Sequence, residues 1–210
     1  MIYINKHKEY HNPVPKDYEE LYGGNLFTDV DADNINYLNP YINEMTGLYY
    51  VWKNKKDKYV GLCHYKRFFY KDGDMLTLED AKKILKNCDI IIKEDVVFNM
   101  SLYWQLRFEV ENSDILDKYL NKIYEVEPDF KEYLNRKQFN NSEMFVCKRE
   151  LIEKYCEWLF PMIIPIAEEY IKEDVNKANT RLIGHIIERL FAYWIYKNNL
   201  KTYVVDYIDI

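Results

Sequence analysis

The sequence of 210 residues contains few cysteines, and none of them is spaced as a zinc or redox motif. Cys63, Cys88, Cys147 and Cys156 lie in apolar or helical surroundings, so we expect reduced, buried thiols and a cytoplasmic protein. No apolar run reaches the ~18 residues of a membrane span, and the start of the chain does not resemble a signal peptide. These absences predict a cytoplasmic location. They leave open peripheral association with the inner face of the membrane.

Basic residues are in the minority, with 29 Lys and Arg against 35 Asp and Glu, and the net charge is −6. Because no basic stripe is present either, a nucleic-acid-binding surface is disfavoured. The pair Gly23-Gly24 lacks the spacing of a Rossmann or P-loop phosphate motif. Asp29, Asp31 and Asp33 alternate like a calcium loop but lack its glycine and its distant glutamate. We therefore predict neither a nucleic-acid partner nor one of these phosphate or calcium loops.

Short apolar runs alternate with segments of helical periodicity, which predicts an α/β sheet with helices on both faces. The length and the 48% apolar content suit a single domain over residues 1–210. Strands are expected at 2–5, 59–63, 88–93, 144–147 and 202–205. Helices are expected at 41–54, 77–86, 112–125, 128–134, 150–172 and 181–198. Asn39 would be the N-cap of the first helix, Pro161 and Pro165 would interrupt the fifth, and 96–110 would be irregular.

The predicted strand at 59–63 runs directly into a polar cluster, His64, Tyr65, Lys66 and Arg67. In open α/β sheets ligands bind beyond the carboxyl ends of strands, so this cluster is a candidate binding site. Its two fixed cations and its imidazole can donate hydrogen bonds to a phosphate. A solvated surface turn is the alternative interpretation.

Four motifs around this strand resemble one known family. They are D-N-I, N-P-Y, E-x-T-x-x-Y-x-x-W-K-N and Y-x-G-L-x-H-Y-[KR]-R, found at 33–35, 39–41, 44–54 and 59–67. The chain is similar to the domain-of-unknown-function family DUF4422 of capsular, exopolysaccharide and O-antigen gene clusters, regarded as glycosyltransferases. Lys66 stands where that family has Arg, and Asn36 where it often has Ser. The resemblance implies a GT-A-like nucleotide-diphospho-sugar transferase fold, with a mixed central sheet flanked by helices.

The resemblance also implies an activity, namely transfer of a hexose from a nucleotide-sugar donor, UDP-linked in our expectation, to a surface polysaccharide or lipid-linked glycan. The expected donor-binding residues are His7, Lys8, Asp33, Asn34, Asn39, Tyr65, Lys66 and Arg67. The expected catalytic residues are Glu44, Glu188 and His64, and Asn141 is the expected acceptor contact. Structural ion pairs for Glu44 and Glu188, and ordinary turn chemistry for Asn141, are the alternatives.

Asp72-Gly73-Asp74 forms a D-x-D pattern, which in many GT-A enzymes helps to hold Mn²⁺ or Mg²⁺ against the diphosphate. The pair lies several residues beyond the predicted strand end, and D-G-D is also common turn chemistry. Lys66 and Arg67 offer the alternative, a metal-independent neutralisation of the leaving group.

Two other functions stay open at this point. One is a non-catalytic module that binds a nucleotide or a glycan within a larger polysaccharide synthase. The other is a hydrolase that acts on a nucleotide sugar between two carboxylates. Turnover of a nucleotide sugar, with or without transfer, distinguishes the three.

Overall fold

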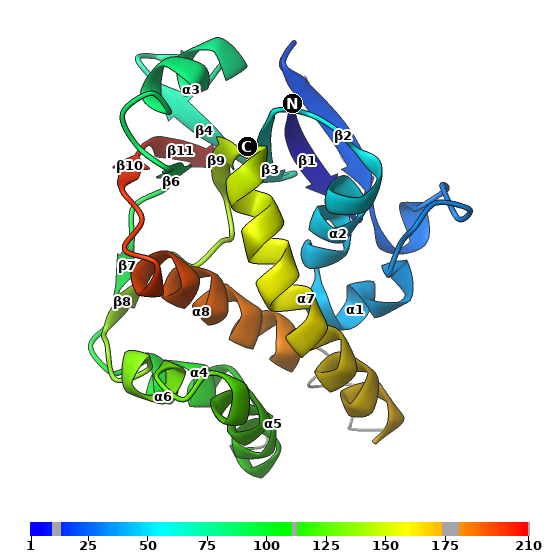
Figure 1. The fold of residues 1–210 in the computed structure, drawn as a ribbon, viewed down its shortest axis with the longest axis vertical. Coiled ribbons are helices and arrows are strands. Elements are labelled where there is room, and N and C mark those ends of the chain that lie inside the picture. Colours follow the sequence, from blue (N-terminus) through cyan, green and yellow to red (C-terminus); the bar gives the residue numbers. More distant parts are fainter. Residues whose placement is uncertain (10–13, 111–112, 174–180, 210) are drawn as a thin grey trace.

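Six strands of a mixed sheet form the centre of the molecule, which a computed structural model describes at residues 1–9, 14–110, 113–173 and 181–209 (Figure 1). The strands follow the spatial order β10-β6-β9-β3-β1-β2. Their bounds are β1 (Ile2–Lys6), β2 (Tyr18–Tyr22), β3 (Tyr59–His64), β6 (Ile90–Ile92), β9 (Phe145–Lys148) and β10 (Thr202–Val204).

The directions of these strands decide where a ligand can bind. β1 is parallel to β2 and β3, and β6 is parallel to β10. β9 lies between β3 and β6 and is antiparallel to both. The carboxyl ends of the other five strands and the amino end of β9 therefore meet at one edge, the carboxyl edge.

The middle of the sheet is buried on both faces, and a glycine in β3 makes the close packing there possible. A methyl group at Gly61 would lie 2.9 Å from Cγ1 of Ile2 in β1 and 3.1 Å from Cγ2 of Val146 in β9. All five residues of β1 are buried, as the apolar run at 2–5 predicts.

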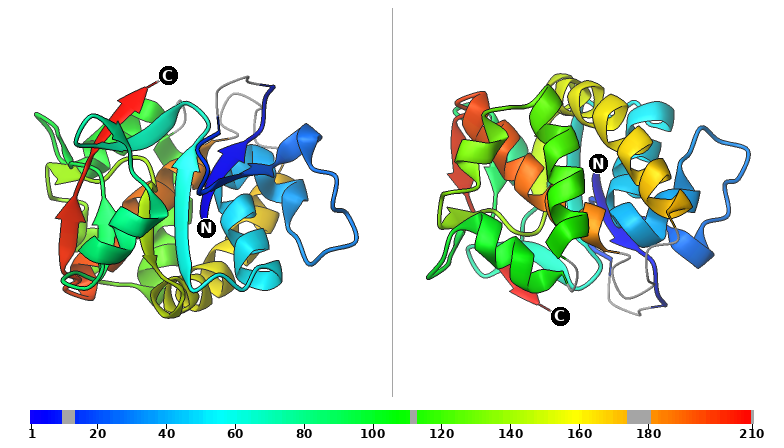
Figure 2. Two further views of the ribbon diagram at one scale, coloured as in Figure 1. Left: turned by 90° about the horizontal axis from the view of Figure 1, so that it is seen from above. Right: turned by 90° about the horizontal axis from the view of Figure 1, so that it is seen from below.

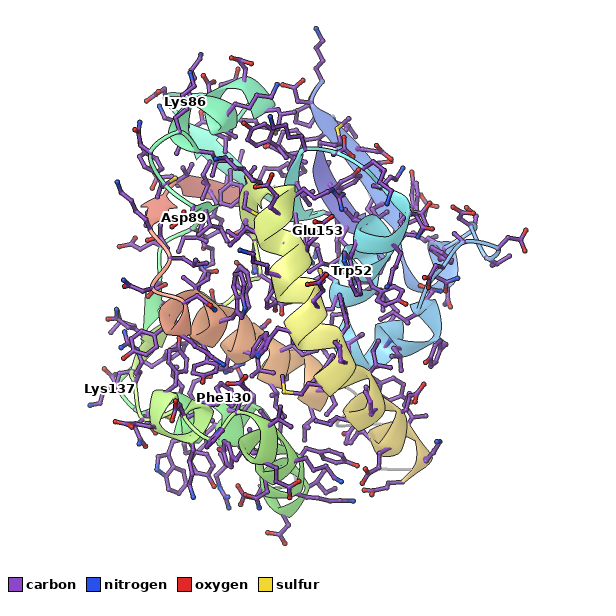
Figure 3. All side chains as sticks on the ribbon, in the orientation of Figure 1. Trp52, Lys86, Asp89, Phe130, Lys137 and Glu153 are labelled. Atoms are coloured by element: carbon purple, nitrogen blue, oxygen red, sulfur yellow. The ribbon has the colours of Figure 1, made fainter. Side chains whose placement is uncertain are left out.

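Four helices cover one face of the sheet, as Figure 1 shows. They are α1 (Asn39–Ile42), α2 (Met45–Asn54), α7 (Arg149–Lys172) and α8 (Leu182–Lys197). Trp52 of α2 stacks on Phe160 of α7, with ring centroids 5.7 Å apart, and lies between the two helices (Figure 3). Tyr155, Leu159 and Phe160 are fully buried, so the aromatic stretch of α7 is core.

Two helix predictions on this face are wrong. The expected helix at 41–54 is broken at Asn43, whose φ of 51° is left-handed, so α1 and α2 are separate. Asn39 is not an N-cap, because its side-chain amide donates to the carbonyl of Asn43 and to the hydroxyl of Thr46. Conversely, α7 continues through Pro161 and Pro165, because burial of its flanking side chains outweighs the two missing N–H donors.

The opposite face is covered by α3 (Leu78–Ile84) and by a hairpin of β4 (Arg67–Lys71) and β5 (Asp74–Met75). The N-cap of α3 is Thr77, whose hydroxyl accepts the N–H of Asp80 at 3.1 Å. β4 also pairs with the C-terminal strand β11 (Asp206–Asp209). Figure 2 shows the C-terminal strands along one side of the molecule and β1 and β2 towards the other. The predicted mixed sheet flanked by helices is confirmed.

The remaining elements pack against the far sides of α7 and α8. They are α4 (Leu102–Glu109), α5 (Ser113–Val126), α6 (Phe130–Tyr133) and the small sheet of β7 (Val96–Val97) and β8 (Gln138–Phe139). Of these, α4 and α6 pack against α8, and α5 packs against α7. Short 3₁₀ turns, η1 (Gly24–Leu26) and η2 (Asn36–Leu38), shape the loop after β2. Phe130 lies between α6 and α8 (Figure 3) and contacts Tyr193, with ring centroids 5.2 Å apart. The prediction of an irregular segment at 96–110 is wrong, because α4 forms there with Ser101 as its N-cap.

Among the helices of the described residues, none is both long enough and apolar enough to cross a bilayer.

Candidate functional site at the carboxyl edge

Polar side chains from elements far apart in the sequence gather at the carboxyl edge. His7 follows β1, His64 ends β3, and Lys93 follows β6. Glu143 lies just before β9, at the same edge because β9 is antiparallel. The topology thus brings together residues separated by more than a hundred positions.

Two histidines and a tyrosine form the first part of this site. The ring of His7 lies 5.0 Å from that of Tyr65 and 6.1 Å from that of His64, centroid to centroid. The pKa of His64 is lowered to about 4, mainly by burial and next by the charge of Arg67. Burial also lowers the pKa of His7, and the charge of Lys8 adds to this. Both rings are therefore neutral at physiological pH.

The tautomer of His64 follows from its neighbour. The backbone N–H of Lys66 donates to Nδ1 of His64 at 3.2 Å, so a neutral ring carries its proton on Nε2. That N–H can be donated to an oxygen atom of a ligand.

Cations surround these rings. Lys66 is exposed, and Arg67 forms an ion pair with Asp209 of β11 at 2.9 Å. Arg181 lies just before α8. Its charge also lowers the pKa of both histidines, although burial is the larger cause. Lys93 is only 3% exposed, and burial lowers the pKa of its ammonium group, with Arg67 as the next cause. The edge therefore offers positive charge from three separate segments.

Three carboxyl groups, on Glu44, Glu143 and Glu188, lie near these cations. Burial raises the pKa of Glu44, and the charge of Glu188 raises it further. Burial raises the pKa of Glu143 well above its ordinary range, and the charges of Glu44 and Glu188 add to this. Because each carboxylate disfavours ionisation of the next, the three form one interacting group.

The corner between α1 and α2 places Glu44 near Glu188. Glu44 is the N-cap residue of α2, directly after the left-handed Asn43. Gly184 of α8 packs against this corner, where a methyl group would overlap the side chain of Asn43 and lie 3.3 Å from the carbonyl oxygen of Tyr41. This glycine allows α8 to approach α1 closely.

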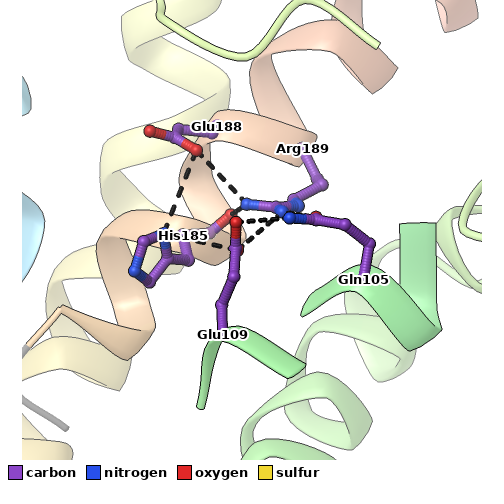
Figure 4. Close-up of polar contacts among 5 residues, drawn as sticks. All are labelled: Gln105, Glu109, His185, Glu188 and Arg189. Atoms are coloured by element: carbon purple, nitrogen blue, oxygen red, sulfur yellow. Dashed lines mark hydrogen bonds and ion pairs between the residues drawn. The ribbon is translucent and has the colours of Figure 1, made fainter. Parts of the chain in front are cut away.

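A buried arginine fixes the orientation of Glu188 (Figure 4). Arg189 is fully buried, and its Nη1 donates to Oε2 of Glu188 at 3.2 Å and to the carbonyl of His185 at 2.8 Å. Its Nη2 donates to Glu109 at 2.7 Å and to the side chain of Gln105, both on α4. The predicted structural ion pair for Glu188 is therefore present, and it joins α4 to α8.

The loop before β9 contains several buried oxygens that have no hydrogen-bond partner within the described parts of the chain. They are Oδ1 of Asn140, Oγ of Ser142 and Oε1 of Glu143. All three side chains are less than 9% exposed. Buried polar groups are rarely left unpaired in native proteins, so this loop is a candidate for ligand contact.

Not all sequence-predicted donor residues join the cluster. The side chain of Asn34 bonds within its own loop, accepting the N–H of Asn36 and donating to the carbonyl of Ala32. Asp33 accepts the hydroxyl of Tyr49 at 3.0 Å, on α2. Asn39 lies closer, against Gly23 and Gly24 after β2, but its amide holds the α1–α2 corner. For these three residues a ligand role stays a prediction.

Asn141, the predicted acceptor contact, is half-buried, whereas its neighbour Asn140 is buried and carries the unpartnered oxygen. Sequence reasoning missed Asn140, Lys93 and Arg181. The position of Lys93 could have been predicted, because it directly follows a strand of three isoleucines and so lies at the carboxyl end of that strand.

The D-x-D pair lies in a tight hairpin turn. Asp72 and Gly73 have φ values of 53° and 93°, as in a type I′ turn between β4 and β5. Asp72 pairs with Lys71, and Asp74 accepts the N–H of Met75 at 2.7 Å. Within the described ranges, no three His, Cys, Asp or Glu side chains converge as metal ligands. Both carboxylates are thus engaged within the turn, so we derive no step through a metal, and binding of Mn²⁺ or Mg²⁺ stays a prediction.

Fold and site together define an α/β protein whose polar groups gather where such sheets bind ligands. The family described as "Domain of unknown function (DUF4422)" matches residues 1–199, and the chain belongs to this family. The family resemblance predicted from the motifs is therefore confirmed. No curated protein matches the chain by sequence.

Among solved structures, the chain is similar to the apo structure of the WbbM bifunctional glycosyltransferase. The two share 21% sequence identity with a TM-score of 0.82, and the match covers 100% of this chain and 45% of the other. The chain thus spans less than half the length of that protein. The likeness confirms the predicted fold.

Proposed function

We propose that the chain is a glycosyltransferase that moves a hexose from a UDP-linked donor to a surface polysaccharide or lipid-linked glycan. The observation that carries this proposal is the carboxyl edge itself. There, neutral histidines and cations lie beside Glu44 and Glu143, two carboxyl groups whose pKa values burial raises. The family and the fold of the WbbM bifunctional glycosyltransferase support it. The activity, partners and location are our inference.

The cationic side of the edge would receive the leaving diphosphate. In glycosyl transfer, the bond between the anomeric carbon and the diphosphate breaks as the acceptor hydroxyl forms its own bond, and negative charge grows on the phosphate. Lys66 and Arg67 would offset that charge, with Arg67 exchanging Asp209 for phosphate oxygens. The Nε2–H of His64 would donate to a phosphate oxygen without adding charge. His7, Lys8 and Tyr65 would line the donor next to it.

The acidic side of the edge would receive the acceptor. Glu44 is our candidate general base, because burial raises the pKa of its carboxyl towards the working pH, where a base is most effective. Glu188 is bound by Arg189 at 3.2 Å, so we assign it the task of raising the basicity of Glu44 through its charge. In an inverting reaction, Glu44 would take the proton of the acceptor hydroxyl as the new glycosidic bond forms.

The test is calorimetric titration of the purified chain with UDP, with and without Mn²⁺. We expect binding without metal, weakened by about tenfold or more in Arg67→Ala, since hydrogen bonds to charged groups contribute ~1.5–3 kcal/mol. Lys86→Ala is the control, because Lys86 is exposed beside α3 (Figure 3). Unchanged UDP affinity in Arg67→Ala would refute the diphosphate assignment.

Three other outcomes separate the alternatives. A requirement for Mn²⁺ would restore Asp72 and Asp74 as ligand candidates. Binding of UDP-glucose and UDP-galactose without turnover, in the presence of polysaccharide acceptors, would favour a non-catalytic module. Release of free sugar with no transfer would favour a hydrolase.

A further inference from the structure

A hollow of about 370 Å³ opens beside the carboxyl ends of β6 and β10. Its volume lies within the ~300–1,000 Å³ typical of small-molecule sites. The residues that matter most in its wall are Glu94, Asp95, Arg136, Asn140 and Tyr196. None of the donor-binding or catalytic residues proposed above lines it.

Asn140 contributes a fixed, buried amide to the wall of this hollow. The side chain is 2% exposed, and its Nδ2 donates to the carbonyl of Lys93 at 2.7 Å, which locks the amide in place. Its Oδ1 has no hydrogen-bond partner among residues 1–9, 14–110, 113–173 and 181–209. An unpaired buried acceptor costs ~1–3 kcal/mol, so a bound molecule that donates a hydrogen bond would be favoured here.

Tyr196 provides an exposed aromatic face at the same place. It is 59% exposed, and the guanidinium carbon of Arg136 lies 4.8 Å from its ring centroid. Tyr133, Arg136 and Tyr196 also line a wider hollow of about 890 Å³. The two hollows therefore adjoin across these three residues and offer more room than one small molecule needs.

The chemistry of the walls selects among ligands. Glu94 and Asp95 in the hollow of about 370 Å³ outnumber its one cation, Arg136, and would disfavour a phosphate or another anion. An aromatic face flanked by amide, carboxylate and guanidinium groups suits a neutral molecule with an apolar ring face and many hydroxyls. A saccharide has both properties, since its axial C–H groups cover the ring and its hydroxyls donate to carboxylates and to an amide oxygen.

We propose that the hollow lined by Asn140 and Tyr196 is a saccharide-binding subsite that holds the acceptor glycan. The preference for a saccharide follows from the residues that line the hollow, whereas its role as the acceptor subsite rests on the proposed transferase function. Lys93 links the two sites, because its carbonyl holds Asn140 while its ammonium group is close enough to Arg67 and Glu188 for their charges to affect its pKa. Lys93 is therefore the residue through which the wall of the hollow is connected to the carboxyl edge.

The test is a glycan array that displays bacterial capsular and O-antigen polysaccharides, followed by calorimetry with the glycan that binds best. We expect the full chain to bind, and Tyr196→Ala to weaken this binding by at least tenfold. Tyr37→Ala is the matched control, since Tyr37 is 57% exposed and lines neither hollow. Asp95→Asn, a nearly isosteric change, serves as a second variant in case Tyr196→Ala fails to fold.

Each outcome bears on the proposal. No binding to any displayed polysaccharide, or equal binding by Tyr196→Ala, Asp95→Asn and the wild type, would overturn it. UDP titrations of the same samples keep the two proposals apart. Retained UDP binding with no glycan binding refutes the subsite alone, and glycan binding with no affinity for any nucleotide refutes the transferase alone.

Discussion

Glu143→Gln tests the electrostatics of the carboxyl edge directly. Glu143 is 3% exposed, its φ is 45°, and its Oε1 has no partner among the described residues. Burial raises the pKa of its carboxyl well above 4.5, Glu44 and Glu188 raise it further, and Arg189 opposes them. The hydroxyl of Tyr155 is also unpartnered within the described chain, and the charge of Glu143 acts on it. The folded protein therefore holds a proton that the unfolded chain releases.

This difference makes stability depend on pH with a defined sign. Below pH 4.5 the carboxyl is protonated in both states and costs nothing. Above that pH ionisation of the carboxyl stabilises the unfolded chain. The free energy of unfolding therefore falls by ~1.4 kcal/mol per pH unit until the pKa of the carboxyl in the folded protein is reached. A glutamine has nearly the same shape and does not titrate, so Glu143→Gln removes this loss.

The assay is urea unfolding of wild type and Glu143→Gln at pH 5, 6 and 7. We expect the free energy of unfolding of the variant, minus that of the wild type, to rise steadily with pH. Glu157→Gln, on the exposed face of α7, controls for the loss of one charge and should stay within ~0.5 kcal/mol of the wild type. A difference that is flat from pH 5 to pH 7 would show that Glu143 ionises normally, and our account of the edge would be wrong.

Two further predictions concern the neighbours of this group. The ring C–H resonances of His64 should titrate in NMR spectra with a midpoint near pH 4, and a midpoint near 6.5 would contradict its burial beside Arg67. Because the pKa of His64 is lower in the folded state, this residue should reduce stability as the pH falls below 6.5. Arg189→Met should lower the free energy of unfolding by ~3–5 kcal/mol in urea, because it leaves Glu109 and Glu188 without their buried cation. A variant as stable as the wild type would show that this ion-pair network is replaceable by apolar packing.

Most elements of the fold were predictable because their signals are local. The apolar runs at 2–5, 59–63 and 144–147 became β1, β3 and β9, with shifts of a residue at their ends. The capping pair Thr77 and Asp80 gave the start of α3 correctly. In each case the residues that carry the signal are the residues that form the element.

The errors arose where distant contacts decide. The segment 102–109 forms a helix because Leu102 and Leu106 are buried and Arg189 binds its polar face, and neither contact is visible in a local pattern. The prolines of α7 are tolerated for the same kind of reason, since the buried helix is stabilised from outside. The strands β2, β4 and β11 lack long apolar runs and gain their hydrogen bonds from partners elsewhere in the chain.

The site was predictable in part, because Glu44 and Glu188 follow from the family resemblance and one cationic cluster follows from a single segment. His64 to Arg67 directly follow an apolar strand, so their position at the carboxyl edge could be inferred from one segment. The role of Glu143 could not, because it depends on the direction of β9. A parallel β9 would place residues 140–143 at the opposite edge of the sheet, far from His64.

This inverted strand also explains how one edge can serve two chemistries. Three of the five strands that end there, β1, β3 and β6, supply histidines and cations, which suit a phosphate group. β9 begins there and supplies a loop of amide, hydroxyl and carboxyl oxygens, which suits hydroxyl groups. Insertion of β9 between β3 and β6 therefore sets an acceptor-like surface within reach of a donor-like one, which is the arrangement that transfer between two bound sugars needs.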